Sequence, residues 1–485
     1  MSEKLKIGWV YGFTALFLVA NLYLIVQKDF YWLFLLPIAL VVLYFYLTSY
    51  DKIILFITFL TPLAVNISDL EMGLGVSLPT EPLMFGVLLI FIANTLFQNK
   101  YDKNISAHPI SYIIYLSLFW IFITMLTSEM PIVSLKFLIS RLWFVVPFFF
   151  IAAMLFRKMD NIKKFLWLYI SGFIIVIIYT TSIHSQFGFE EQAGHWAMSP
   201  FYNDHTAYGA ALAMFIPVSV GLIFFPEQKK WVRVMATFAL LILTLAVFLS
   251  YSRAAWLSII AAAGIFFLVI FRIKFYWVIT ILIVVFGLFF AFQNQIIDKL
   301  EKNKQDSSAN LAEHIQSMTN ISSDASNLER INRWQSAIRL YEVKPVFGWG
   351  PGTYQFVYSP FQRSKEKTTI STNLGDKGNA HSEYLGAMAE QGLMGLIIVL
   401  LLFGSVIYYG LTVFRKGDLK VKFLSMMATT GLITYVAHAV LNNFLDTDKL
   451  SVPFWGFIAI IVALDVYHCK ETDEKSDKKL LSDSA

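Results

Sequence analysis

Long runs of apolar residues, separated by short polar segments, recur along most of the chain. A run of about 17–25 apolar residues can cross the hydrocarbon core of a bilayer as a helix. The pattern therefore predicts an all-α, polytopic integral membrane protein with about fourteen transmembrane helices, in a range of 12–14. The predicted spans cover residues 7–26, 31–50, 53–68, 81–98, 109–126, 132–156, 165–186, 206–225, 231–250, 254–271, 275–293, 393–414, 423–443 and 451–468.

One long polar interruption, residues 294–392, predicts a large loop with helices of its own. Asn327 is a candidate N-cap for the first loop helix, which should end near Pro345. The apolar stripe expected to bury this helix consists of Ile331, Trp334, Ile338 and Tyr341. A second amphipathic helix is expected over residues 379–391, and Gly392 should stop it.

Composition and charge placement add an orientation. Hydrophobic residues make up 57% of the chain and charged residues only 15%, against about 25% charged residues in soluble domains. Most lysines and arginines between spans fall on one side, whereas only Lys28, Arg253 and Lys449 fall in short loops on the other. By the positive-inside rule, both termini are expected in the cytoplasm and the large loop outside it. The single cysteine, Cys469, excludes an intramolecular disulfide and a cysteine-cluster metal site.

Cations inside or beside the spans are the first candidates for chemistry. Arg141 lies within the sixth predicted span, where it is either a structural cation bonded to carbonyl groups or a cation lining a polar cavity. Lys136 lies nearer the surface and can extend its amine to the interface. Arg253, at the start of the tenth span, is either an interfacial arginine or a binding residue.

The sharpest motif is His381-Ser382, followed by nine residues and then Gly392-Leu393-Met394-Gly395. Here the chain resembles the O-antigen ligase and O-antigen polymerase family of bacterial inner-membrane glycosyltransferases. The segments from Ser252 to Trp256 and from Arg333 to Gly350 resemble the same family. The resemblance divides the chain into residues 1–205 as N-terminal transmembrane helices, 206–446 as a ligase/polymerase-like domain with the loop 294–392, 447–468 as the last transmembrane helix and 469–485 as a cytoplasmic tail.

The resemblance implies a fold like that of the C-type membrane glycosyltransferases and an inverting, metal-independent transfer. The donor would be a polyprenyl-pyrophosphate-linked polysaccharide, and the acceptor lipid A–core or a similar molecule on the periplasmic side of the inner membrane. His381 would accept the proton of the acceptor hydroxyl or bind the pyrophosphate. Guanidinium groups suit pyrophosphate oxygens. The candidates for that binding are Arg253 and Arg141, with Arg333 and Arg330 in reserve; Ser382, Gly392 and Gly395 complete the motif.

Several alternatives stay open. A polymerase of the same family, a protein O-oligosaccharyltransferase or, in a different class, a transporter or flippase of lipid-linked glycans also fits a polytopic chain. A transporter should show charge pairs within its spans and two matching halves, which this sequence lacks. Asp446 and Asp448 have the spacing of a carboxylate pair for a divalent ion, but no second carboxylate cluster supports such a site, and a capping or solvated loop explains them better. We therefore expect no metal, no cofactor and no nucleic-acid partner, and membrane lipids around the helices.

Overall fold

The computed structural model describes residues 3–29, 33, 35–67, 76–98, 101–272, 325–367, 371 and 378–469. The chain divides into two compact units, residues 1–54 and 55–485. The first unit contains α1 (Glu3–Lys28), α2 (Leu35–Thr48) and the start of α3 (Tyr50–Leu60). The predicted span at 275–293, the polar start of the predicted loop up to residue 324 and the tail from residue 470 lie outside the described residues.

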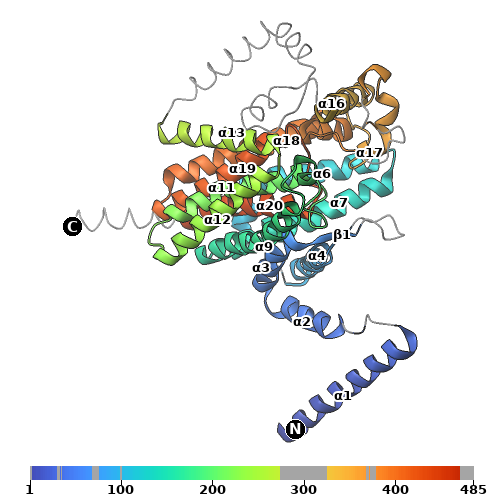
Figure 1. Ribbon diagram of the computed structural model, residues 1–485, viewed down its shortest axis with the longest axis vertical. Coiled ribbons are helices and arrows are strands. Elements are labelled where there is room, and N and C mark those ends of the chain that lie inside the picture. The colour runs from blue at the N-terminus through green and yellow to red at the C-terminus, as the bar shows by residue number, and fades with distance from the viewer. Residues whose placement is uncertain are drawn as a thin grey trace, which may run out of the picture. The chain divides into compact units, whose positions relative to one another are not determined.

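The second unit is a helical bundle with a small helical subdomain at one edge (Figure 1). Its helices are α4 (Thr80–Gln98), α5 (Lys103–Ser106), α6 (Pro109–Leu126), α7 (Pro131–Val145), α8 (Ala152–Leu155), α9 (Met159–Ser185), α10 (Glu191–Gly194), α11 (His205–Phe224), α12 (Lys230–Leu249), α13 (Arg253–Ile270), α16 (Ala325–Val343), α17 (Tyr354–Val357), α18 (Glu383–Lys416), α19 (Leu419–His438) and α20 (Asp448–Ala463). Short π-helical turns join α7 to α8 and extend α20 to Cys469.

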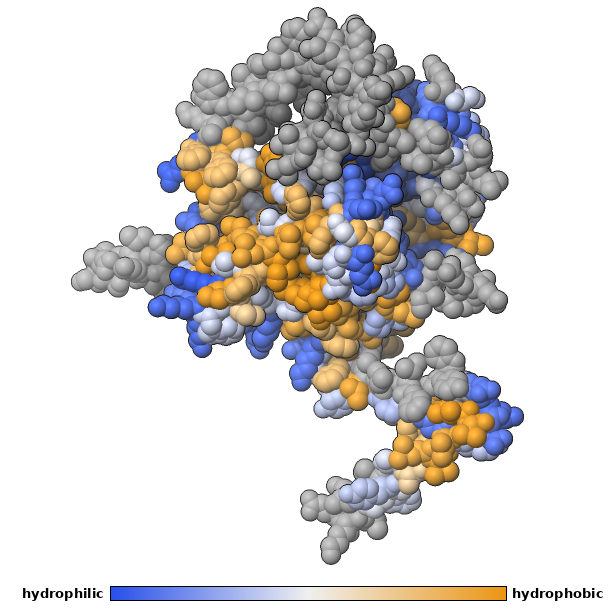
Figure 2. Space-filling view, viewed as in Figure 1, coloured by the Kyte–Doolittle hydropathy of each residue, from blue (hydrophilic) through white to orange (hydrophobic). Residues whose placement is uncertain are grey.

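Ten helices in the described part of the chain are long and apolar enough to cross a membrane. Strands there are confined to one antiparallel hairpin of β1 (Val65–Ile67) and β2 (Val76–Leu78). These findings confirm the predicted all-α, polytopic membrane fold. In Figure 2, hydrophobic residues dominate the visible face of the second unit over α9, α11 and α12, and hydrophilic residues gather around α16 and α17.

Two of the predicted spans are too short in the structure. The span expected at 31–50 contains α2, which has 14 residues. The span expected at 53–68 is wrong in its second half, because α3 ends at Leu60 after 11 residues and gives way to a 3₁₀ turn and to β1. Pro62 in that turn has no backbone N–H to continue the helical ladder.

The span expected at 423–443 corresponds to α19, which has 20 residues but is less apolar than the ten. The helix runs through the middle of the bundle, packed against α11, α13, α18 and α20. Its buried side chains include Ser425, Thr429, Thr430 and Thr434. A helix surrounded by other helices needs small side chains for close approach more than it needs a lipid-facing apolar surface.

The loop helices form as predicted, with shifted bounds. The first, α16, runs from Ala325 to Val343, so its start lies before the predicted N-cap Asn327. The second begins at Glu383 rather than at 379, and its helical path breaks at Gly392, which has φ 68° and ψ −168°. It then continues to Lys416, so that α18 joins the loop subdomain to the bundle as one interrupted helix.

The buried face of α16 differs from the predicted apolar stripe. Its buried residues are Glu329, Asn332, Arg333, Ser336, Ala337 and Leu340. Ile331, in the predicted stripe, is 39% exposed. Glu329 and Arg333 form a buried ion pair with 2.6 Å between Oε1 and Nε, so the inward face is a mixture of polar pairs and small residues. The stripe prediction is wrong because it assumed a purely apolar core.

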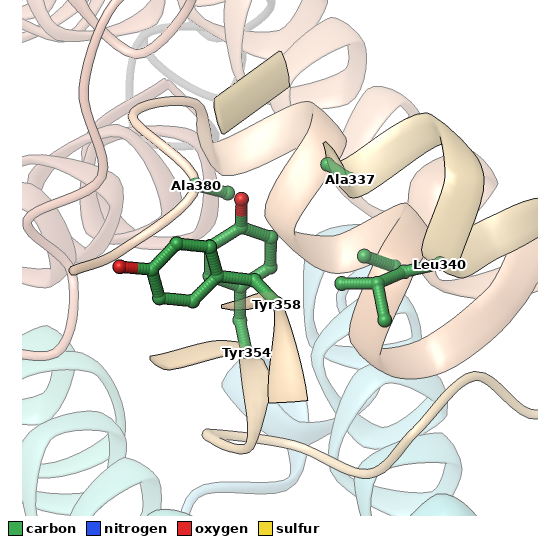
Figure 3. Packing of buried hydrophobic residues seen from close by; sticks show 6 residues of the cluster. Ala337, Leu340, Tyr354, Tyr358 and Ala380 are labelled. Carbon is green, nitrogen blue, oxygen red and sulfur yellow. The ribbon is translucent and has the colours of Figure 1, made fainter. Parts of the chain in front are cut away.

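A small core fixes this subdomain against α18 (Figure 3). The rings of Tyr354 and Tyr358 stack with centroids 5.3 Å apart, and Ala337 and Leu340 of α16 pack against them. Ala380, next to His381 in sequence, belongs to the same cluster. The backbone that carries His381 is therefore held by tightly packed side chains on one side.

Candidate functional site

A cavity of about 390 Å³ opens among α6, α7, α17, α18 and the segment before α20. Charged side chains converge on it from different elements. They are Lys136, Arg141, Glu383, Glu390 and Asp446. A hollow lined by five ionisable groups between apolar helices is costly to build without a polar occupant, which makes it a candidate site.

One face of α18 forms a long wall of this cavity. Glu383 and Glu390 are seven residues apart, which places both on the same side of the helix. Gly386 and Ala387 lie between them and leave room for the hollow. Gly395 continues the same face beyond the break, and a Cβ atom there would lie 2.7 Å from the carbonyl oxygen of Ala387. The motif glycine Gly395 is thus required by close packing across the kink.

The two glutamates brace the cavity wall. Oε1 of Glu383 accepts hydrogen bonds from the Tyr435 hydroxyl at 2.6 Å and from the backbone amides of Phe444 and Leu445 at 2.9 and 3.0 Å. Glu390 accepts two backbone bonds of 2.9 Å, from Gly352 and Tyr354. Their carboxylates hold the segments after α19 and before α17 at the edge of the cavity.

Arg141 and Asp446 face the cavity from opposite elements. Nη1 of Arg141 donates to the carbonyl oxygen of Leu445 at 3.1 Å, and its guanidinium lies 5.1 Å from the Phe137 ring centroid. Burial and the nearby Glu383 raise the pKa of Asp446 to about 6, while Arg141 opposes the shift. Arg141 combines the two roles that the sequence left open, because it bonds to a carbonyl group and also lines a polar cavity.

His381 lies at the end of the same wall. Its neighbours Asn379 and Ser382 both line the cavity. Its backbone is in the left-handed region, with φ 49°. The amide of His381 donates to Oδ1 of Asn379 at 3.0 Å, and its carbonyl accepts from Nε1 of Trp334 at 3.1 Å. Ser382 caps α18 by accepting from the Leu385 amide. The motif histidine is therefore held in a strained conformation by its own neighbours in sequence and by Trp334 of α16.

The side chain of His381 interacts with Asn442, Asp204 and Arg330, and His438 interacts with the same three residues. We call these five residues the histidine centre. Burial, together with the charges of Arg330 and Arg333, lowers the pKa of His381 to about 4, although a hydrogen bond with Asn442 and the charge of Asp204 oppose the shift. The imidazole is neutral at pH 7 and can accept a proton or a hydrogen bond.

Two helices supply the far side of the histidine centre. Nε2 of His438, on a side chain only 1% exposed, lies 3.1 Å from the Asn442 amide nitrogen. Asp204 caps α11 through bonds to the amides of Thr206 and Ala207 at 2.7 and 2.8 Å. Asp204 is therefore the N-cap residue of α11.

The predicted arginines divide between the two parts of the site. Arg330 belongs to the histidine centre. Arg333 is 4% exposed, paired with Glu329 and only 4.0 Å from the Tyr358 ring centroid, so it is built into the subdomain core. Arg253 starts α13, and the backbone of the next residue, Ala254, approaches the His438 ring. Arg141 lies in the cavity instead.

The glycine run after α16 clamps the subdomain to the bundle. The amides of Trp349 and Gly350 donate to the carbonyl groups of Ala389 and Glu390 at 3.2 and 2.8 Å. At Gly392, where φ is positive, a Cβ atom would clash with the carbonyl oxygen of Val346. The helix breaks because the amides of Trp349 and Gly350 bond to the carbonyl groups of Ala389 and Glu390, which would otherwise accept hydrogen bonds from the next turn of α18.

The carboxylates Asp446 and Asp448 do not act together. Asp448 accepts a 2.6 Å bond from the Thr80 hydroxyl and lies 3.9 Å from the Lys449 amine, away from the cavity wall to which Asp446 belongs. Among the described residues, no group of three or more histidine, cysteine or acidic side chains is arranged to hold a metal ion.

Sequence reasoning missed several residues of the site. Glu383 and Glu390 could have been predicted to lie together, because acidic residues seven apart on an amphipathic helix share a face. The approach of His438 and Asn442 to His381 depends on how α19 packs against α18, so the sequence alone did not reveal it.

Comparison with known proteins supports the sequence motif. Residues 238–400 match the family model described as O-antigen ligase; this range includes His381, Gly392, Gly395, Arg253, Arg330 and Arg333. An uncharacterized protein of Haemophilus influenzae is 21% identical over 155 residues, which is 32% of this chain. The alignment spans about a third of that relative's length, 34%. This match confirms the resemblance inferred from the histidine motif, over residues 238–400.

Proposed function

We propose that this protein is a membrane glycosyltransferase of the O-antigen ligase type, which transfers a polyprenyl-pyrophosphate-linked polysaccharide to lipid A–core or a similar acceptor. The observation that carries the proposal is the position of His381, which hydrogen bonds hold at the end of a cavity lined by charged side chains. The O-antigen ligase match over residues 238–400 supports it independently.

The chemistry needs a base and a group that stabilises a departing pyrophosphate. The acceptor hydroxyl attacks the anomeric carbon of the donor, its proton passes to the imidazole of His381, and the carbon–oxygen bond to the pyrophosphate breaks with inversion. The leaving group carries its negative charge away with the polyprenyl chain. Guanidinium groups neutralise that charge through paired bonds to phosphate oxygens, so we propose a metal-independent transfer.

The arginines are assigned separate roles. Arg330 and Arg253, at or beside the histidine centre, are proposed to bind the pyrophosphate. Arg141 is proposed to bind it from the cavity, or to hold the acceptor there. Arg333 is already committed to Glu329 and Tyr358 and is proposed to fix the position of α16 rather than to contact the substrate. The alternative role of His381, as a pyrophosphate ligand, is compatible with the same arrangement.

We further propose that the protein lies in the bacterial inner membrane with both termini in the cytoplasm, so that the loop subdomain faces the periplasm. The asymmetric placement of lysine and arginine supports this orientation. In that orientation the charged cavity lies toward the outer leaflet, where a translocated donor and a lipid-anchored acceptor both have access.

The test is glycan display in a deletion strain complemented with wild type or with His381→Ala. Surface glycolipid and carrier-linked glycan are resolved on gels. Long carrier-linked chains without capped acceptor in the deletion strain, restored only by wild type, are expected for a ligase. Single repeat units on carrier and acceptor would instead identify a polymerase, and loss of glycan from proteins alone an oligosaccharyltransferase. Unchanged pools, or full complementation by His381→Ala, would contradict the proposal.

A further inference from the structure

The turn that follows α16 contains two exposed apolar residues at an unexpected place. Val346 is 59% exposed and Phe347 is 41% exposed. The Phe347 ring stacks on Trp120 of α6, with centroids 5.8 Å apart and 21° between the ring planes. Trp120 lies six residues before the end of α6 at Leu126, which corresponds to a depth of about 9 Å along the helix axis. A segment of the loop subdomain therefore reaches down beside a membrane-spanning helix.

The surfaces on both sides of this turn are those of lipid-facing helices. On α6, the exposed side chains near Trp120 include Leu116, Phe119 and Phe122. On α18, directly after the break, Leu393, Met394 and Ile397 are also exposed. The apolar tip of the turn continues one surface from α6 to α18, whereas an aqueous loop in the same position would interrupt it with polar side chains.

The backbone of the turn is suited to an apolar surrounding. Non-helical backbone is tolerated at membrane depth only where other protein groups satisfy its hydrogen bonds. The amide of Gly348 donates to Lys344 at 3.1 Å, and the carbonyl group of Pro345 accepts from the Leu393 amide at 3.0 Å. The Leu393 amide is free to do so because the ladder of α18 breaks at Gly392. A backbone hydrogen bond thus joins the turn directly to the kink.

We propose that the turn at residues 345–348 is inserted into the leaflet on the side of the loop subdomain, with Val346 and Phe347 in contact with phospholipid acyl chains. The insertion anchors the end of α16 to the bilayer. Lys344, immediately before the turn, bonds to Glu129 at the α6–α7 connection and lies 4.5 Å from the Trp349 ring centroid, which is the arrangement expected at a membrane interface. This proposal is independent of the proposed transferase activity.

The experiment uses the full-length protein in nanodiscs, with Cys469→Ser as the background and single cysteines labelled with the environment-sensitive dye NBD. Val346→Cys and Phe347→Cys are the test positions. Glu342→Cys is the matched control, because Glu342 is an exposed polar residue near the end of the same helix. Nanodiscs are prepared with ordinary or with brominated phosphatidylcholine, and iodide serves as the aqueous quencher.

Brominated lipid is expected to remove roughly half of the emission at both test positions, while iodide leaves it nearly unchanged. The label at Glu342 should respond in the opposite sense. Quenching by iodide at residues 346 and 347, as at the control, would place the turn in water and overturn the proposal. Protection from both quenchers would show that protein, such as a second copy of the chain, covers the turn, and this too would overturn it.

Discussion

The side-chain amide nitrogen of Asn442 lies 3.1 Å from Nε2 of His438 and leaves Asn442 able to hydrogen-bond to the ring of His381 as well. A buried amide between two histidines fixes the orientation of both rings. Since His438 is inaccessible to solvent, its part in the site is to position Asn442, and through it His381.

Asn442→Ala is expected to reduce transfer, because a buried hydrogen-bond partner of His381 disappears. Losing such a partner costs about 1–3 kcal/mol, which corresponds to a decrease of roughly 5- to 150-fold in kcat/KM. The hydrogen bond that Asn442 accepts from the ring raises the pKa of His381, so the variant should also show an acid limb at lower pH. Asn161→Ala, which removes a buried asparagine bonded to Leu155 far along the chain, is the control. An unchanged pH profile in Asn442→Ala would argue against a positioning role.

The pH dependence of transfer should reflect the low pKa of His381. Only neutral imidazole accepts a proton, so kcat/KM should fall as the pH drops through about 4 in the free enzyme. Bound pyrophosphate is negative and favours the charged ring, so the acid limb of kcat should lie at higher pH than that of kcat/KM. Initial rates from about pH 3 to 8 with a purified lipid-linked donor give both limbs. Identical limbs would indicate that no anion binds beside His381.

The same shift predicts a loss of stability in acid. His381 has a pKa of about 4 in the folded protein against 6.5 in the unfolded chain, so the unfolded state binds more protons between these values. The stabilisation by neutral His381 is therefore complete above pH 6.5 and decreases as the pH falls toward 4. Thermal unfolding in detergent should show His381→Gln to be less sensitive than wild type in this window. Parallel curves for the two proteins would contradict this prediction.

Arg253→Ala and Arg141→Ala should each abolish detectable transfer, or reduce kcat by roughly 100- to 1,000-fold, if they stabilise the departing pyrophosphate. Insertion and abundance in the membrane should remain normal. Complementation and membrane immunoblots in the deletion strain measure the two properties separately. Arg363→Ala, at an exposed position of the loop subdomain, is the control. Normal transfer by both variants would refute the pyrophosphate role.

Gly392→Ala should destabilise the protein by about 1–3 kcal/mol or more, since φ is positive there and the added methyl group meets the Val346 carbonyl. Gly404→Ala, in the same helix with nothing within 4 Å of the added carbon, should be neutral or stabilising by up to about 1 kcal/mol. Thermal unfolding of the two variants in one detergent makes the comparison. Equal stability would mean that the kink is not required.

Hydropathy alone was enough to predict the fold class, because ten apolar helices carry the signal locally. The glycine at the end of the second loop helix was also predictable, since its effect on the backbone is local. The buried face of α16 was not, because Arg333 becomes a core residue only through Glu329 and Tyr358. The hydrogen bonds of Glu383 were not predictable either. Its partners Tyr435 and Phe444 lie more than fifty residues away in sequence, and only the packing of the helices brings them to Glu383.

The nine residues between Ser382 and Gly392 form two and a half helical turns with a fixed end at each side, the serine cap and the glycine break. Their number therefore sets the distance between His381 and the break in α18. Adding one residue would raise His381 by about 1.5 Å and rotate it by about 100° around the helix axis, away from Asn442 and Arg330. The number of residues between Ser382 and Gly392 thus fixes where His381 stands relative to the break in α18.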